Sequence, residues 1–147
     1  MSIQQRLTEA MKEAMKAKDS LRLNAIRMAR TALKNAEIEA RGELDDAATI
    51  RVLSTLVKQR REAADAYRAT RPELADKEEQ ELAVLQEFLP AQLTEAELVS
   101  MVEQTIAETG ASSPRDMGTV MKQLTPQTTG RADGKLVSQL VRSKLGA

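Results

Sequence analysis

The sequence predicts an all-α protein, and three observations support this prediction. Apolar residues repeat at three- and four-residue spacing through nearly every segment, which is the period of one buried helical stripe. No segment shows the strict two-residue alternation of a half-buried strand. Ser, Thr, Asp or Pro stand where these segments begin, and Gly stands where several of them end, as in capped helices. We expect an N-terminal bundle of long helices followed by a small three-helix C-terminal domain.

Two helices are expected before Gly42. Ser2 can cap the first, and Asp19 or Ser20 can cap the second, which then runs to Arg41 and stops at Gly42. Both helices are rich in alanine, and small side chains permit close approach of neighbouring helices. On the second helix the expected core residues are Leu21, Ala25, Met28, Ala29, Ala32 and Ala36, with Leu33 beside them.

Two further helices are expected before Pro90. Asp45 or Asp46 opens the third, which closes ahead of Pro72 because a residue that precedes proline avoids the helical region. Pro72 suits the first turn of the fourth helix, which must end before Pro90. Long antiparallel helices with short connections predict a helical bundle.

Three short helices are expected after Pro90. A capping box begins the first at Thr94, and Gly110 ends it. Pro114 stands at the first position of the second helix, and Asp133 is a plausible N-cap for the last. The expected domains are therefore residues 1–90 and residues 91–147.

The formal charges sum to zero, with 22 Lys and Arg against 22 Asp and Glu, but they are unevenly distributed. Residues 1–71 carry a net charge of +5, residues 72–110 a net charge of −9, and residues 111–147 a net charge of +4. These segments can complement one another within the fold, or they can display separate basic surfaces. The sequence leaves both arrangements open.

The composition excludes several kinds of chemistry. Because the chain has no Cys and no His, disulfides, thiol catalysis and histidine acid–base chemistry are excluded. Gly130–Lys135 ends in Gly-Lys but lacks the spacing of a phosphate-binding P-loop. The acidic run at residues 76–81 lacks the alternating ligands and central glycine of a calcium loop. We identify no catalytic residues, no metal site and no cofactor motif.

Targeting and membrane signals are also lacking in the sequence pattern. No apolar run approaches the length of a membrane span, and the first residues do not resemble a signal peptide. These features predict a cytoplasmic protein without a membrane partner.

Positive charge gathers in the last helical hairpin. Lys122 lies seven residues after Arg115, and Arg142 lies seven after Lys135, so each pair shares a helical face, while Arg131 lies in the connection. A folded-back helix pair can bring these side chains onto one surface beside a helix N-terminus, where anions bind. The alternative is an ordinary solvated hairpin. The five candidate anion-binding residues are Arg115, Lys122, Arg131, Lys135 and Arg142.

A second basic face lies on the second helix, where Arg27, Arg30, Lys34 and Arg41 fall within about 60° of one another. An ordinary solvated face and a nucleic-acid contact both remain possible for this stripe. The chain has one Tyr and one Phe, which make a poor platform for stacking single-stranded bases. If an RNA binds, the sequence favours the backbone of a structured RNA as the contact.

Two C-terminal motifs carry a family resemblance. DMGTVMKQL at residues 116–124 and GRADGKLVSQLV at residues 130–141 resemble the signature of the YqeY family. The resemblance extends back through FLPAQLT at residues 88–94 and LNAIR at residues 23–27, so it covers nearly the whole chain. The YqeY family is similar to the tail domain of the B subunit of the tRNA-dependent Glu/Asp-tRNA amidotransferase.

This resemblance implies a stand-alone GatB/YqeY-type tail domain that binds tRNA or another structured RNA as an accessory protein, with translation-related proteins as further partners. Carried over by motif, Lys122, Arg131 and Lys135 are assigned to phosphate contact. Asp133 is assigned to helix capping. The glycines carried over with the motifs are Gly118, which permits close approach of a neighbour or of RNA, and Gly130 and Gly134, which shape the backbone.

The family label also includes carbon–nitrogen ligase activity with glutamine as amido-nitrogen donor. We do not assign this activity to the chain, because the part of the B subunit that activates glutamyl-tRNA has no counterpart in the sequence. The alternative to RNA binding is a protein-interaction adaptor, in which the acidic segment at residues 72–110 docks on a basic partner.

Overall fold

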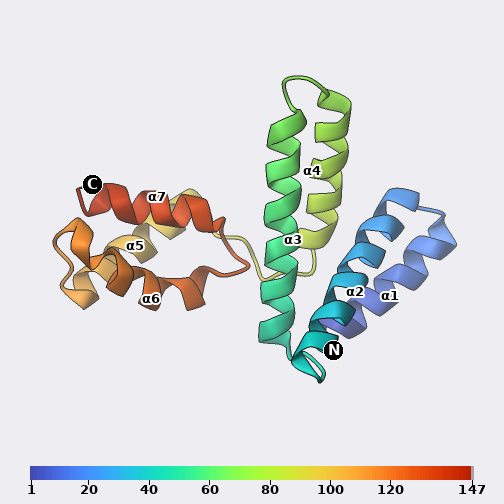
Figure 1. Cartoon of the computed structure of the whole chain (residues 1–147), viewed down its shortest axis with the longest axis horizontal. Helices are drawn as coiled ribbons and strands as arrows, with labels where there is room; N and C mark the ends of the chain where they lie inside the picture. The colour runs from blue at the N-terminus through green and yellow to red at the C-terminus, as the bar shows by residue number, and fades with distance from the viewer. Residues whose placement is uncertain (147) are drawn as a thin grey trace. The chain divides into compact units, whose positions relative to one another are not determined.

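The computed structural model describes residues 1–146. Every regular element in this range is a helix, which confirms the all-α prediction (Figure 1). The chain divides into two compact units, Met1–Pro90 and Ala91–Ala147.

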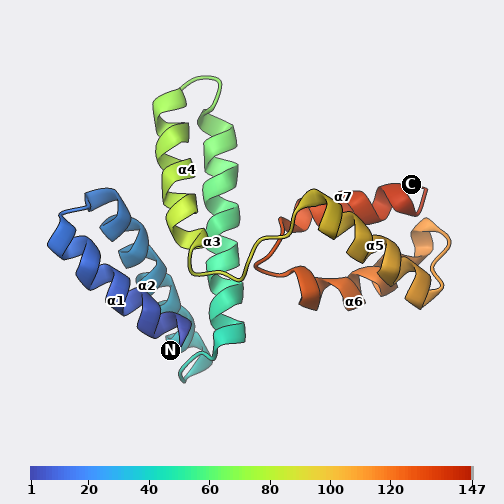
Figure 2. The same cartoon turned by 180° about the vertical axis from the view of Figure 1, so that it is seen from behind.

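The N-terminal unit consists of two helical hairpins. Helices α1 (Ile3–Ala17) and α2 (Ser20–Ala40) form the first, and α3 (Asp46–Tyr67) and α4 (Pro72–Gln86) form the second (Figures 1 and 2). One hydrophobic core joins residues of all four helices. Its buried members are Ile3, Leu7, Ala10, Ala25, Ile26, Ala29, Leu33, Leu53, Val57, Val84, Leu85 and Phe88.

The starts of these helices follow the capping residues in the sequence. Ser2 and Gln5 form a reciprocal capping box at the start of α1. Asp19 and Asp45 accept a hydrogen bond from a backbone N–H of α2 and α3 respectively. Pro72 occupies the first turn of α4, where the missing N–H has no partner to lose. Local chemistry therefore fixes where each long helix begins.

Two helices of this unit end on a non-glycine residue that has a positive φ. Lys18 follows α1 with φ 57°, and Arg41 follows α2 with φ 56°, so both are in the left-handed region. Helix α2 was expected to stop at Gly42. It ends one residue earlier, because Arg41 takes the left-handed conformation. This conformation destabilises the fold at a residue with a Cβ, because the left-handed region costs roughly 1–2 kcal/mol outside glycine.

Lys18→Gly is therefore expected to raise the free energy of unfolding of the N-terminal unit by about 0.5–1 kcal/mol, net of the added chain entropy. Urea denaturation at constant pH measures the change. Lys18→Ala is the matched control, because it removes the same long side chain and keeps the strain. Equal stability of the two variants would contradict the strain account.

The C-terminal unit contains three α-helices and one short 3-10 turn. These are α5 (Glu95–Thr109), the 3-10 turn η1 (Pro114–Asp116), α6 (Met117–Thr128) and α7 (Gly134–Lys144). Thr94 caps α5, and Gly110 ends it with φ 69°. The buried core of this unit consists of Leu98, Val102, Val120, Leu124, Val137, Val141 and Leu145.

Carboxylates of the acidic segment at residues 72–110 form ion pairs with cations of the same unit. Arg60 on α3 lies 3.3 Å from Glu78 and 3.4 Å from Glu81, and Glu81 is buried. Arg68 donates to Glu79 at 2.6 Å, and this hydrogen bond is the main reason that the pKa of the Arg68 guanidinium is raised. In these pairs the segments complement one another within the fold, which was the first of the two arrangements that the sequence left open.

Candidate nucleic-acid interface

The connection between α6 and α7 contains one glycine, Gly130, whose backbone has a positive φ, which favours glycine. Gly130 is buried, has φ 79°, and its carbonyl accepts a hydrogen bond from the Gln92 side chain at 2.7 Å. Gly134 is instead the first residue of α7 and has no positive φ. The backbone-shaping role predicted for Gly134 is therefore wrong, because an ordinary helical conformation at that position accepts other residues.

Asp133 is the N-cap of α7. Its carboxylate accepts a hydrogen bond from the backbone N–H of Lys135 at 3.1 Å. The carboxylate thus already occupies one of the donors at this helix N-terminus. An anion that approached the same terminus would meet this negative charge.

Arg131 has a structural role that the sequence did not reveal. Its Nε donates to the Ala91 carbonyl at 3.2 Å, and its own carbonyl accepts from the Leu93 N–H at 2.8 Å. With the bond from Gln92 to Gly130, these contacts tie residues 91–93 to the α6–α7 connection. Two of the sequence motifs therefore meet in space, and no local periodicity could have indicated this contact.

Gly118 lies on an open part of the surface of α6. A Cβ built there would meet nothing within 4 Å among the described residues. The close approach of a neighbouring part of the protein, predicted for Gly118, is therefore wrong. Close approach of an RNA at this position stays a prediction.

The candidate cations are spread along the α6–α7 hairpin. Lys135 lies beside the connection, whereas Arg142 lies in the last turn of α7 and Arg115 precedes α6. The 12 residues of α6 span about 18 Å, so Arg115 lies at the end of the hairpin away from the connection. A ligand that contacted all of these residues would have to follow the length of the hairpin.

Four of the five candidate cations are exposed and not engaged by the fold. Within residues 1–146, no carboxylate lies within ion-pair distance of Arg115, Lys122, Lys135 or Arg142. Lys144 differs, since its ammonium lies 2.8 Å from Glu103 on α5. The four unpaired cations are the strongest surface candidates in this unit.

The charge of the C-terminal unit is divided between its helices. Helix α5 carries four carboxylates and no cation, whereas residues 111–147 carry six cations and two carboxylates. Both of these carboxylates serve helix ends: Asp116 accepts from the backbone N–H of Ser112 at 2.9 Å, and Asp133 caps α7. The unit is neutral in total, but its hairpin is basic.

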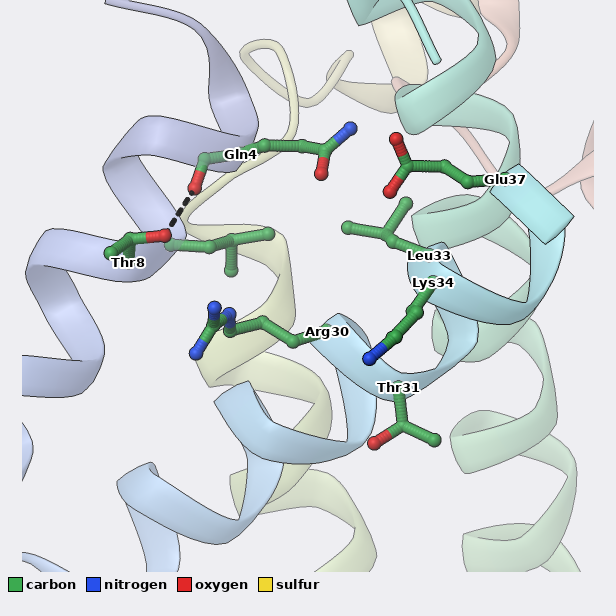
Figure 3. A pocket seen from close by; sticks show the side chains of 8 residues that line it. Gln4, Thr8, Arg30, Thr31, Leu33, Lys34 and Glu37 are labelled. Carbon is green, nitrogen blue, oxygen red and sulfur yellow. Dashed lines mark hydrogen bonds between the residues drawn. The ribbon is translucent and has the colours of Figure 1, made fainter. Parts of the chain in front are cut away.

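The basic face predicted on the second helix is divided by the structure. Arg27, Arg30 and Lys34 are all exposed on α2. Arg30 and Lys34 line a groove between α1 and α2, together with Thr8 and Glu37, as Figure 3 shows, whereas Arg27 does not line it. A nucleic-acid contact by these three residues stays a prediction.

One family model matches nearly the whole chain. The model of the family described as Yqey-like protein matches residues 4–145. The chain belongs to this family. The match includes both units and confirms the resemblance seen in the motifs.

Curated relatives of this YqeY-family chain carry the name "Altered inheritance of mitochondria protein 41, mitochondrial". The relative from Lachancea thermotolerans is 34% identical over 74% of this chain, and the relative from Vanderwaltozyma polyspora is 38% identical over 56%. The chain spans 60% and 46% of the lengths of these two proteins. A relative from Pyrenophora tritici-repentis is 29% identical over 97% of this chain and 80% of its own length.

These names correct the expected location. The sequence predicted a cytoplasmic protein, and this prediction is contradicted because the relatives are named as mitochondrial proteins. The physical reason is that apolar runs report on secretion and membrane insertion. They do not distinguish one aqueous compartment from another.

Neither a membrane span nor a metal site is found among the described residues. In residues 1–146, no helix is both long enough and apolar enough to cross a membrane. In the same residues, no group of three or more acidic side chains is placed to hold a metal ion. Neither the family description nor the names of the relatives states a catalytic activity.

Proposed function

We propose that this YqeY-family protein binds the backbone of a structured RNA, with tRNA as the leading candidate, through the basic surface of the α6–α7 hairpin. The observation that carries the proposal is the charge division of the C-terminal unit. Exposed cations without carboxylate partners lie on the hairpin, and the carboxylates lie mainly on α5. A phosphate chain that followed the hairpin would release counterions at each contact.

Lys122 and Lys135 are the residues that we assign to phosphate contact, with Arg115 and Arg142 extending the surface. Lys122 is exposed, and it lies opposite the buried stripe formed by Val120 and Leu124. Among the described residues, neither lysine has an ion pair or a side-chain hydrogen bond, so each can reach an external phosphate without breaking one. Arg131 is assigned mainly to holding residues 91–93, although part of its guanidinium can still reach an anion.

The lack of stacking residues supports backbone recognition over base recognition. Phe88 is 4% exposed and belongs to the core of the N-terminal unit, where Arg6 lies over its ring. Tyr67 is only partly exposed. Proteins that bind single strands stack bases on exposed rings, whereas duplex RNA is recognised through phosphates and 2′-hydroxyls.

The proposed role is that of an accessory protein, and it includes no amide transfer. The resemblance to the amidotransferase tail domain supports tRNA as the substrate class and translation-related proteins as neighbours. The competing proposal is a protein adaptor that uses the acidic segment. Glu78 and Glu81 pair with Arg60 of α3, and Glu79 pairs with Arg68 directly after α3, which leaves less of that charge for a partner.

Lys122→Gln and Lys135→Gln are each expected to weaken tRNA affinity about fivefold at about 0.15 M salt, because each removes one phosphate contact. The slope of log affinity against log salt should fall by about one per contact. Fluorescence anisotropy with labelled tRNA at several salt concentrations measures both quantities on the intact chain.

Lys77→Gln is the matched control, because Lys77 is an exposed lysine of α4 outside the proposed surface. Its affinity should change less than twofold. Undetectable tRNA binding at low salt, or binding that does not respond to salt, would overturn the RNA proposal. Capture of a protein partner that is lost when residues 76–81 are reversed in charge would instead support the adaptor.

A further inference from the structure

The groove between α1 and α2 has the features of a small anion site. Its volume is about 340 Å³, and Leu7 and Leu33, both buried, line its wall. Figure 3 shows Arg30 and Lys34 extending from α2 toward α1, with Thr8 across the groove on α1, and Thr31 of α2 is also among the lining residues. The cavity therefore combines an apolar wall with polar side chains from both helices, and its cations come from α2.

The fold does not neutralise the two cations in this groove. Other arginines of the unit pair with carboxylates: Arg22 with Glu87, and Arg60 with Glu78 and Glu81. Among the described residues, by contrast, neither Arg30 nor Lys34 has a carboxylate within 4.0 Å. Arg30 donates one N–H to the Met11 sulfur at 2.8 Å, a weak acceptor that leaves most of the guanidinium donors available. Like charges four residues apart on a helix repel each other, so the pair gains from a bound anion.

The hydroxyl groups of the groove differ in their hydrogen bonds. The Thr8 hydroxyl donates to the Gln4 carbonyl at 3.1 Å, as Figure 3 shows. In the described part of the chain, the Thr31 hydroxyl has no such bond to its own helix. Thr31 can therefore donate to a ligand beside Lys34, which lies three residues further along the same helix.

We propose that this groove binds a phosphate group through Arg30, Lys34 and the Thr31 hydroxyl. The planar guanidinium matches two phosphate oxygens, the ammonium adds a point charge, and the hydroxyl donates to a third oxygen. Glu37 lines the side of the groove on which Gln4 lies, so the phosphate occupies the side of Arg30 and Thr31 (Figure 3). This site is separate from the C-terminal surface and does not depend on the function proposed for it.

Titration of the intact chain with inorganic phosphate at pH 7, followed by amide NMR at fixed ionic strength, tests the proposal. Saturable shifts are expected at residues 4–8 and 30–34, with a dissociation constant on the order of millimolar for two exposed charged contacts. Acetate at the same ionic strength should bind more weakly, because it offers fewer oxygens and less charge.

Four variants distinguish a built site from general attraction to positive charge. Arg30→Gln and Lys34→Gln should each weaken phosphate binding about tenfold, and Thr31→Val should weaken it severalfold with both cations kept. Glu37→Gln should tighten it, because it removes the one negative charge that lines the groove. The matched control is Arg27→Gln, which removes a cation of the same helix that does not line the groove.

Absence of saturable shifts, or equal weakening by Arg27→Gln and Arg30→Gln, would overturn the proposal. The source of the phosphate is tested by a second titration, in which an RNA hairpin replaces inorganic phosphate. The same groove shifts at micromolar RNA would assign the phosphate to an RNA backbone, whereas a response to inorganic phosphate alone would assign it to a free phosphate or phosphomonoester. Lys122→Gln and Lys135→Gln should leave inorganic phosphate binding unchanged, so the two proposals can fail independently.

Discussion

Arg60→Met is expected to lower the free energy of unfolding of the N-terminal unit by about 3 kcal/mol. Arg60 lies 3.4 Å from the carboxylate of Glu81, which is 6% exposed, and 3.3 Å from Glu78. The methionine side chain replaces most of the apolar stem of Arg60, but it leaves the Glu81 carboxylate buried without its cation. Removal of one partner of a buried pair costs more than the pair contributes, because the remaining charge stays desolvated.

The double variant Arg60→Met with Glu81→Met separates desolvation from packing. Because it removes both charges, it should recover most of the loss, and chemical denaturation of Arg60→Met, Glu81→Met and the double variant completes the cycle. The exposed pair of Lys58 and Glu62, 4.0 Å apart, provides the control, and Lys58→Met should cost under about 0.5 kcal/mol. A loss of that same small size for Arg60→Met would show that the α3–α4 ion pairs contribute little to stability.

Leu124→Ala is expected to destabilise the C-terminal unit by about 3 kcal/mol while leaving the N-terminal unit unchanged. Leu124 is fully buried in a core that contains only residues of the C-terminal unit. Removal of its side chain leaves a cavity between α5, α6 and α7, and a small unit has little stability in reserve. Residue-resolved hydrogen exchange should show faster exchange in residues 95–144 and unchanged exchange in residues 3–86.

Leu53→Ala is the reciprocal variant, because Leu53 is equally buried in the core of the N-terminal unit. It should accelerate exchange in α1 to α4 and spare α5 to α7. Leu136, which is 38% exposed, is the control for leucine removal in α7, and Leu136→Ala should cost less than about 1 kcal/mol. A single transition that both core variants shift equally would contradict the proposed domains at residues 1–90 and 91–147.

The sequence by itself determined the helical class and most helix starts. Periodic apolar residues and caps act within a few positions of each other, so Ser2, Asp45, Pro72 and Asp133 indicate their helix ends without knowledge of the rest of the fold. The exposed cations of the last hairpin could likewise be found from sequence spacing. Whether they contact RNA stays a prediction.

The tertiary structure decided which side of α2 faces the core. The sequence placed Met28 there, but Met28 is 38% exposed, and Ile26 is fully buried. Both residues are apolar on an alanine-rich helix, so the local pattern tolerates either face. The packing of the unit settles the choice, because Ile26 belongs to one buried cluster with residues of α1, α3 and α4.

The tertiary structure also decided what the charged and motif residues do. Arg131 contacts Ala91 across 40 positions of sequence, and Arg60 meets Glu81 on the neighbouring helix. Such contacts depend on which distant chain segments pack together. The three- and four-residue spacing within a helix does not predict that packing. For this reason the sequence did not reveal that Arg131 also holds the chain at residues 91–93, whereas its contact with phosphate stays a prediction.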